Sequence, residues 1–401
     1  MTATTDNLRS DIDEIMPGVI ADRRYLHTIP ELGKELHDTA AYVLERLKAI
    51  GVADIKTGIA VTGMTALITG NKPGDNRTVL LRADMDALPI LEENDAEYVS
   101  TRPGAMHACG HDGHTAMLLG IAQLLMERKD EFSGTVKLLF QPCEEIPPGG
   151  AKFMIEEGVL ENPHVDAVFG MHVSSDTPVG QIKYRPGASS ANSDRVQIIV
   201  KGKGGHGAAP HDSVDPVITA AHIAIALQSI VSRNVDPVDS AVITVGKLAG
   251  GEANNVIPDT AEMKLTVRTF LPATRALVKE RIHSIAKNVA EAFGATAEVT
   301  YNEGYPSVIN DVACTALVEE VATEVVGRDN AIMQGARMGG EDFSYFLQER
   351  PGSFFYVGVQ NVDRGIVWGH HHPRFDLDEE GLGYGIEVMT RVAMRYLNEG
   401  V

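Results

Sequence analysis

The sequence predicts an α/β domain that is interrupted by a smaller α+β domain of ferredoxin-like topology. Two observations support this prediction. In the first half of the chain, helical stretches alternate with short apolar runs that end in ionisable residues. A middle segment then changes to the order strand, helix, strand, strand, helix, strand, after which α/β patterns resume. We therefore expect residues 1–189 and 306–401 to form one discontinuous α/β domain and residues 190–305 to form an inserted domain.

The α/β pattern of the first half rests on three helical stretches and three apolar strands. The helices are expected at Asp6–Leu26, Thr39–Ile50 and His114–Glu131, and the strands at Thr78–Ala83, Val136–Phe140 and Ala167–Met171. The ionisable residues that follow the strands are Asp84 and Asp86, Glu144 and Glu145, and His172. Ligands of open α/β sheets bind outside the carboxyl ends of the strands, so these side chains are expected at one edge of the sheet.

The middle segment has four expected strands and two expected helices. The strands are Arg195–Lys201, Ala241–Leu248, Thr260–Phe270 and Thr296–Tyr301, and the helices are Asp215–Arg233 and Ala273–Phe293. The strand at 260–270 alternates strictly, with Ala261, Met263, Leu265 and Val267 on one face, which is typical of a half-buried antiparallel strand. A helix at Ala313–Val326 and a strand at Phe354–Val359 then return to the α/β pattern.

Composition and charge exclude several classes of function. The 401 residues are 44% hydrophobic and 22% charged, which is typical of a globular protein, and no apolar run approaches the roughly 20 residues that span a bilayer. The N-terminus lacks the basic and apolar segments of a signal peptide, so a cytoplasmic location is expected. A net charge of -20 disfavours nucleic acid and membranes as partners and leaves small molecules. Three cysteines are too few for a disulfide framework.

The segment Met106–His114 (MHACGHDGH) places one thiol and three imidazoles directly before a helix. Its Cys-x-His pair, Cys109 and His111, has the spacing to direct sulfur and imidazole at one ion, and this donor pair suits zinc. Taken alone, a buried thiol beside a polar helix start explains the same residues.

The segment Gln141–Glu145 (QPCEE) ends an apolar strand in two adjacent carboxylates. One carboxylate has the chemistry to bind an ion, while the other takes a proton from water and passes it to a leaving amine. A solvated acidic turn is the alternative. His172 in GMHV and the triple His370–His372 in GHHHPRFD add imidazoles, each of which alone could be structural. Their convergence favours a metal centre.

Seven motifs occur in order along the chain: VLLRADMDALPI, MHACGHDGHTAMLLG, FQPCEE, GMHV, GGHGAAPH, GGEDF and HHHPRFD. Together they resemble the peptidase M20 family, in particular its branch of aminoacylases, hippurate hydrolases and auxin-conjugate (IAA-amino acid) hydrolases. The resemblance covers essentially the whole chain. It implies a phosphorylase/hydrolase-like α/β metallopeptidase domain with an inserted ferredoxin-like α+β lid domain, and a homodimer or higher homo-oligomer formed through that lid.

The resemblance also implies two divalent metal ions per subunit. Zinc is favoured by the cysteine, with manganese, cobalt and nickel as alternatives. The implied metal ligands are Cys109, His111, Glu145, His172 and His371. His370 is the alternative at the last position. Asp84 stands where other branches carry a metal-binding histidine, so the resemblance leaves its role open.

Catalytic and substrate-binding roles follow from the same motifs. Glu144 matches the general base of the family, and Asp86 matches an acidic residue that orients the site. His206 matches a lid histidine that polarises the scissile carbonyl, sometimes in the partner subunit's site. Arg268 and Asn255 stand on lid elements where the family binds the substrate carboxylate, and an arginine fork suits a carboxylate.

The expected function is hydrolysis of N-acyl (acetyl, benzoyl or similar) amino acids to a carboxylic acid and a free amino acid, by metal-activated water with a glutamate base. Other deacetylases, carboxypeptidases or dipeptidases of the same family are alternatives that a substrate panel would separate. Two further alternatives are a non-catalytic dimeric binding module and a redox protein that uses Cys109. The presence of the full ligand set and Glu144 disfavours the binding module.

Overall fold

The computed structural model describes residues 7–401, which fall into two compact units. Unit 1 comprises residues up to 187 together with 309–335 and 342–401, and unit 2 comprises 188–308 and 336–341. The sequence placed 336–341 in the α/β domain. They join unit 2 because backbone hydrogen bonds connect Arg337 to Ser189 and Ala191. Residues 1–6 lie outside the described residues, and they include Asp6, the expected first residue of the first helix, and the start of the N-terminal segment in which no signal peptide is expected.

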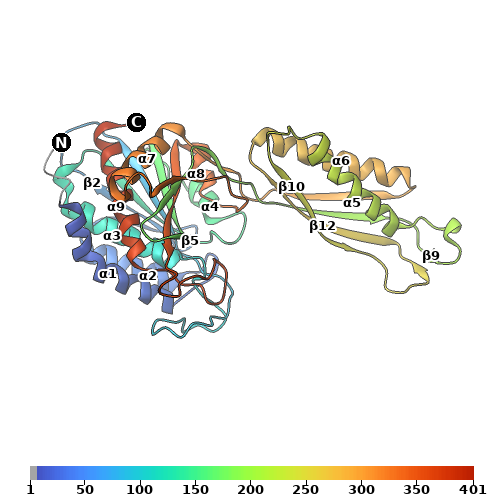
Figure 1. The fold of residues 1–401 in the computed structure, drawn as a ribbon, viewed down its shortest axis with the longest axis horizontal. Coiled ribbons are helices and arrows are strands. Elements are labelled where there is room, and N and C mark those ends of the chain that lie inside the picture. Colours follow the sequence, from blue (N-terminus) through green and yellow to red (C-terminus); the bar gives the residue numbers. More distant parts are fainter. Residues whose placement is uncertain (1–6) are drawn as a thin grey trace. The chain divides into compact units, whose positions relative to one another are not determined.

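Unit 1 is built on a mixed eight-stranded sheet with the order β1-β2-β4-β3-β5-β16-β6-β15 (Figure 1). The strands are β1 (Asp54–Ile59), β2 (Gly63–Thr69), β3 (Thr78–Asp84), β4 (Thr135–Gln141), β5 (Ala167–Pro178), β6 (Ile182–Tyr184), β15 (Ala331–Met333) and β16 (Gly352–Gln360). The four central strands β4, β3, β5 and β16 are parallel. The carboxyl ends of β4 and β3 therefore meet at one edge, as the sequence predicted.

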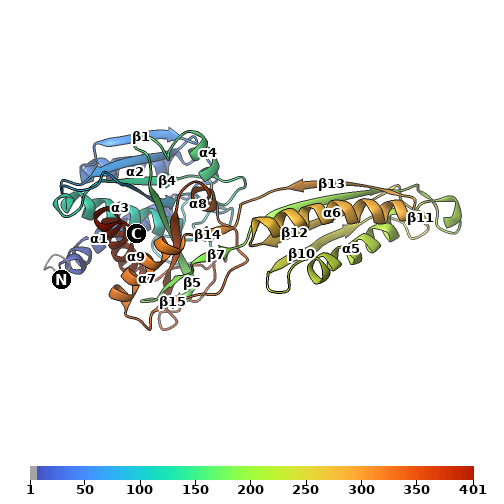
Figure 2. The same cartoon turned by 90° about the horizontal axis from the view of Figure 1, so that it is seen from above.

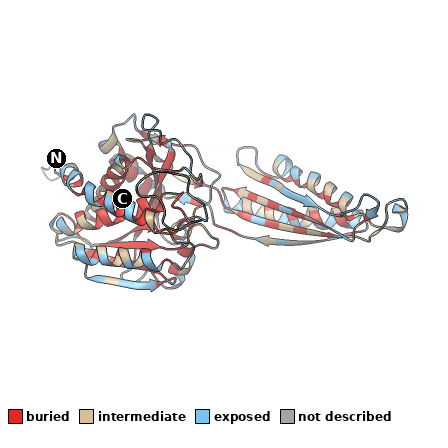
Figure 3. Ribbon diagram, turned by 90° about the horizontal axis from the view of Figure 1, so that it is seen from below, coloured by how far each residue is buried: buried red, intermediate tan, exposed pale blue. Residues whose placement is uncertain are grey.

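Helices cover both faces of this sheet. The helices are α1 (Leu8–Thr28), α2 (His37–Ile50), α3 (His111–Glu127), α4 (Gly150–Glu156), α7 (Val312–Val326), α8 (Ser344–Glu349) and α9 (Glu380–Glu399), with a 3-10 turn at Lys129–Glu131. Helices α3, α7 and α9 pack on one face with α1 and α2 outside α3, and α4 and α8 contact each other on the opposite face. Every residue of β3 is buried, as expected for a strand covered on both faces (Figure 3).

Two differences between unit 1 and the sequence predictions bear on the candidate site. Strand β5 continues to Pro178, so His172 lies within the strand and not after it. The helix expected at 114–131 begins at His111 and ends at Glu127. Because α3 begins at the second residue of the Cys-x-His pair, its first turn becomes part of the candidate site.

Unit 2 contains a four-stranded antiparallel sheet with the order β10-β12-β8-β13 and two helices on one face (Figure 2). Its elements are β8 (Asp194–Lys201), α5 (Pro216–Arg233), β10 (Ala241–Ala249), β12 (Thr260–Thr269), α6 (Pro272–Ala292) and β13 (Thr296–Asn302). The chain order βαββαβ with this strand order is the ferredoxin-like arrangement, so the predicted topology is confirmed. The alternating residues 261, 263, 265 and 267 of β12 are buried as expected.

Short elements complete the described chain. Strand β9 (Gly205–His206) pairs with β11 (Val256–Ile257), β7 (Gly187–Ser190) pairs with β14 (Val308–Asn310), and a 3-10 turn spans Pro210–Asp212. Helix α5 is the one helix of the described residues that is long and apolar enough to cross a membrane by length and composition. A single such helix is weak evidence for a membrane span, and Ala220, Ile223 and Leu227 of α5 belong to the core of unit 2.

Candidate metal centre

Asp86 holds the turn that carries the two adjacent glutamates. Its side chain is buried just after β3, and its two carboxylate oxygens accept hydrogen bonds from the backbone nitrogens of Glu144 (2.8 Å) and Glu145 (3.1 Å). Cys143, directly before them, has φ 63°, a left-handed conformation that is costly for a residue other than glycine. The two bonds to Asp86 help to hold this strained turn. The orienting role of Asp86 stays a prediction.

The five expected metal ligands converge in unit 1. Ligand atoms of Cys109, His111 and His172 lie within 4.8 Å of one another, and so do those of Cys109, Glu145 and His371. The Cys109 Sγ is 3.4 Å from His172 Nε2, and His371 Nε2 is 3.4 Å from Glu145 Oε1. Two triads that share Cys109 are an arrangement suited to two neighbouring ions.

Unpaired buried atoms test whether this cluster fits a metal. Both ring nitrogens of His111 and the Oε1 of Glu145 are buried without a hydrogen-bond partner in the described structure. Each unsatisfied buried polar group costs about 1–3 kcal/mol, so an added ion would relieve the cost. Thiolate, imidazole and carboxylate are the ligands of zinc and similar metals. The residues therefore fit a dinuclear centre of divalent ions.

The pKa values of the clustered residues also favour a site for positive ions. Burial lowers the pKa of His111, but the surrounding carboxylates, chiefly Asp84 and Asp86, outweigh burial and raise it to about 10. Burial and the carboxylates of Glu145 and Glu144 raise the pKa of the Cys109 thiol. Without an ion, the site thus attracts protons, which is the behaviour of a site that lacks positive charge.

A chain of hydrogen bonds fixes the orientation of His172. Its Nδ1 donates to the carbonyl of Val173 (2.6 Å), which leaves Nε2 on the side of Cys109. The backbone nitrogen of Val173 donates to His114 Nε2 (2.9 Å), so His114 carries its proton on Nδ1, which donates to Asp84 Oδ1 (2.5 Å). The ring of His114 is thus held by Val173 of β5 from one side and by Asp84 from the other, and Val173 also accepts the bond from His172.

Asp84, whose role the sequence left open, is a fully buried carboxylate. Burial raises its pKa, but Arg82, His111 and His114 outweigh burial and hold the pKa well below its usual range. Arg82 bonds to Asp84, to Gln141 Oε1 (3.0 Å) and to Asp342 Oδ1 (2.7 Å). Asp84 therefore supports the ligand residues, and its Oδ2 lies 3.7 Å from His111 Nε2.

The three C-terminal histidines have different surroundings. His370 Nε2 accepts a bond from the backbone of Ser175 (3.2 Å), and burial with the nearby His114 and His371 lowers its pKa to about 4. His372 Nδ1 accepts from the backbone of Arg374 (3.0 Å). His371 has φ 63° and, among the three, is the one that joins a ligand triad. This geometry favours His371 over His370 as the C-terminal ligand.

The remaining expected residues belong to unit 2 and are described only within it. His206 on β9 is paired with Val256, next to Asn255, whose carbonyl accepts a bond from Gly207 (2.8 Å). Arg268 lies near the other end of β12, half-buried, with a weak contact to the Asn192 carbonyl (3.5 Å). Unit 2 therefore brings His206 and Asn255 together and keeps Arg268 apart from both.

Sequence reasoning missed the supporting residues Arg82, His114 and Asp342. Arg82 interrupts an otherwise apolar strand, and an arginine in a fully buried strand must find carboxylate partners, so this signal was available. His114 was noted in its motif without a role. Asp342 stands in GGEDF and accepts bonds from Gln141 Nε2 (2.9 and 2.7 Å) and from the backbone of Ala151 (3.0 Å).

Comparisons with known proteins match almost the whole chain. The profile of peptidase family M20/M25/M40 matches residues 80–395. The chain is 40% identical over 397 residues to thermostable carboxypeptidase 1 of Saccharolobus solfataricus, covering 98% of this chain and 99% of that protein. It is 43% identical over 380 residues to N-acetyl-L-cysteine deacetylase of Bacillus subtilis, covering 95% and 88%. The crystal structure of Bacillus subtilis YXEP, described as a dinuclear metal binding peptidase from the M20 family, has a TM-score of 0.84 at 35% identity, covering 96% and 99%.

Proposed function

This chain belongs to the peptidase M20 family, and from that premise we propose that it hydrolyses N-acyl amino acids to a carboxylic acid and a free amino acid. The observation that carries the proposal is the pair of ligand triads that share Cys109, beside the carboxylate of Glu144. The deacetylase named above acts on an N-acyl amino acid, which supports this substrate class.

In the proposal, two divalent ions per subunit are held by Cys109, His111, Glu145, His172 and His371. When bound, such ions activate water at neutral pH and polarise the carbonyl oxygen of the scissile amide. The cysteine favours zinc, and manganese, cobalt or nickel are the alternatives. The dinuclear relative supports the number of ions and does not identify the metal.

The remaining chemistry belongs to Glu144. Its carboxylate takes the proton from the attacking water and then gives it to the nitrogen of the leaving amino acid. Asp86 holds the backbone of Glu144 and of Glu145, as its hydrogen bonds from their two backbone nitrogens suggest. His206 is proposed to stabilise the negative charge that develops on the carbonyl oxygen, with Asn255 and Arg268 binding the substrate carboxylate.

The distance between Arg268 and the pair His206 and Asn255 within unit 2 affects how many copies of the chain contribute to one active site. Arg268 lies eight residues along β12 from Thr260, a distance of about 27 Å at about 3.4 Å per residue, and β11 lies beyond that end. One small substrate does not reach both ends. We therefore propose that His206 and Asn255 serve the site of a different copy from the one that Arg268 serves, so that the active form is a homodimer or higher homo-oligomer.

Two alternatives remain open to test. The similarity to thermostable carboxypeptidase 1 supports a carboxypeptidase or dipeptidase that uses the same site. A non-catalytic binding module would not need Glu144 beside the ligand triads. The proposed location is the cytoplasm, which agrees with three cysteines that are all buried and unpaired.

The test is amino acid release from N-acetyl, N-benzoyl and indole-acetyl amino acids and from dipeptides, after metal removal and after adding back zinc, manganese or cobalt. Metal-dependent release from the N-acyl series is expected. Faster release from dipeptides would replace the proposal with the peptidase alternative. No release with any metal would contradict catalysis on these substrates and favour the binding module.

A further inference from the structure

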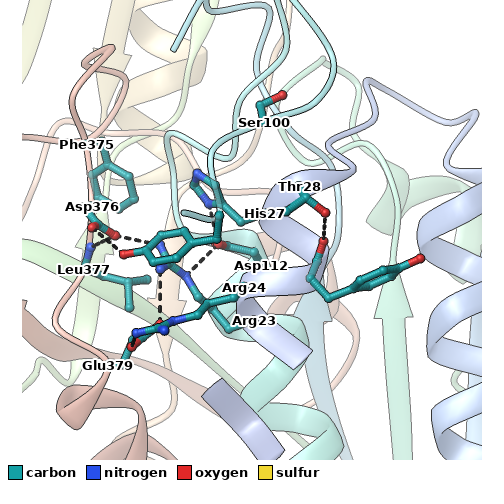
Figure 4. Close-up of polar contacts among 12 residues, drawn as sticks. Arg23, Arg24, His27, Thr28, Ser100, Asp112, Phe375, Asp376, Leu377 and Glu379 are labelled. Carbon is teal, nitrogen blue, oxygen red and sulfur yellow. Dashed lines mark hydrogen bonds and ion pairs between the residues drawn. The ribbon is translucent and has the colours of Figure 1, made fainter. Parts of the chain in front are cut away.

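A buried arginine outside the candidate centre contacts three carboxylates. Arg23 on α1 is fully buried, and Figure 4 shows it among its polar partners. Its Nε donates to Asp112 Oδ2 (2.8 Å), one terminal nitrogen donates to Asp376 Oδ1 (2.8 Å), and the other contacts Glu379 Oε1 (3.4 Å). Burial alone would lower the pKa of Arg23, but these carboxylates outweigh burial and raise it.

The partners of Arg23 lie in two segments that carry proposed ligands. Asp112 follows His111 directly, in the first turn of α3. Asp376 lies five residues after His371, in the loop that leads to α9. These segments are far apart in the sequence, and Arg23 comes from a third segment that is remote from both. One guanidinium therefore connects the Cys109–His111 segment to the His371 segment.

Further side chains make the connection rigid. His27, one turn after Arg23 on α1, contacts the same Asp112 oxygen through Nδ1 (2.7 Å) and Glu92 Oε1 through Nε2 (3.1 Å). The Tyr98 hydroxyl donates to the second oxygen of Asp376 (2.8 Å). These contacts restrict the positions of Asp112 and Asp376, because each carboxylate is bound by two side chains.

We infer that Arg23 is a positioning residue for the candidate metal centre: it sets the spacing between the segment of Cys109 and His111 and the segment of His371. The inference rests on the proposed ligand set. Three donors that point at three different carboxylates require the planar fork of arginine, which a lysine ammonium does not reproduce. Residues that orient metal ligands typically contribute 10- to 100-fold to metal affinity.

A matched pair of substitutions tests the inference. Arg23→Lys keeps the charge and removes the fork at the proposed positioning site. Arg128→Lys makes the same change at another buried arginine of unit 1, which bonds to Asp11 and Glu131 and contacts no residue of the ligand segments. Zinc affinity of each metal-free variant is measured by competition with a chromophoric chelator, and the cobalt form is examined by its visible spectrum.

The expected result is a 10- to 100-fold loss of zinc affinity and an altered cobalt spectrum in Arg23→Lys, with wild-type values in Arg128→Lys. If Arg23→Lys does not fold, Asp376→Asn, which changes a partly exposed partner, is expected to weaken zinc binding in the same direction. Wild-type affinity in a folded Arg23→Lys or Asp376→Asn, or equal losses in both lysine variants, would overturn the inference. Failure of the wild-type protein to bind two ions would instead refute the proposed centre.

Discussion

The two units place charged groups differently although each is a sheet covered by helices. Unit 1 buries the ionisable side chains Arg23, Arg82, Asp84, His111 and Asp112, whereas within residues 194–302 the one buried ionisable side chain is Asp194. Burying charge is costly, so a cluster of buried charged side chains is a candidate functional site. Unit 1 therefore gives up stability by burying charged groups that its chemistry needs, while unit 2 has an ordinary apolar core.

The largest expected effect tests whether the chemistry resides in unit 1. Glu144→Gln should leave folding and metal content unchanged and lower kcat by about 10²- to 10⁴-fold, because the general base is lost. Amino acid release is measured together with metal content. Glu156→Gln, an exposed glutamate on α4, is the matched control. Turnover near the wild-type rate in Glu144→Gln would show that Glu144 is not the general base.

The second prediction compares a fully buried arginine of unit 1, Arg82, with a partly exposed arginine of unit 2, Arg275. Arg82→Met should lower the free energy of unfolding of unit 1 by about 3–5 kcal/mol, because Asp84 and Asp342 lose a fully buried partner. Arg275→Met in unit 2 should cost less, about 1–3 kcal/mol, because Arg275 is partly exposed and its loss affects one buried carboxylate, that of Asp194. Asp194 also keeps hydrogen bonds from the Tyr301 hydroxyl (2.8 Å) and the Gly304 nitrogen (3.0 Å). Amide exchange in urea reports on each unit separately. Equal losses in the free energy of unfolding would contradict the difference between the two units.

The third prediction concerns protons at the centre. In the metal-free protein the pKa of His111 is raised to about 10, so His111 contributes stability below about pH 6.5 that is lost as the pH rises through about 10. At pH 7.5 a metal ion must displace this proton and that of the Cys109 thiol. Affinity should rise about tenfold per pH unit for each proton released.

Calorimetric titration in buffers of different ionisation enthalpy counts these protons. Metal addition should also raise the unfolding temperature of unit 1 and leave that of unit 2 unchanged, because the proposed ligands lie in unit 1. Binding without proton release would show that His111 and Cys109 are not ligands.

The smallest effect should be the same in both units. Asp215 caps α5 in unit 2 through the backbone nitrogens of Val217 (2.8 Å) and Ile218 (3.2 Å), and Asp311 caps α7 in unit 1 through Cys314 (2.8 Å). Alanine at either position should cost about 1 kcal/mol. Chemical denaturation checks both variants. A clear inequality would show that local helix energetics also differ between the units.

Much of the fold could be predicted because its signals are local. Strand order in unit 2 followed from alternation and element order, and the buried strands of unit 1 followed from apolar runs. Strand β1 was missed because it is an edge strand whose residues Asp54, Lys56 and Thr57 are exposed, so it has no apolar run. Helix α9 was missed because three glycines near its start mask its pattern, and two of them, Gly381 and Gly385, are required by close packing against Gly358 and Met117.

The candidate site was predictable only in part. The motif residues could be assigned through the family resemblance, and the structure brings the five expected ligands together. The roles of Arg23 and Arg82 could not be predicted, because their partners lie up to 356 and 260 residues away in the sequence. Such contacts leave no periodicity or spacing in the sequence.

The length of strand β12 separates the two ends of unit 2 that carry proposed substrate-binding residues. If its two ends serve the sites of different copies, the number of residues in the strand sets the distance between neighbouring sites. Inserting two residues into each strand of the sheet would keep every side chain on its face and lengthen the sheet by about 7 Å. A change of one residue would instead turn the apolar face outward. The reach between sites is therefore adjustable only in steps of two residues.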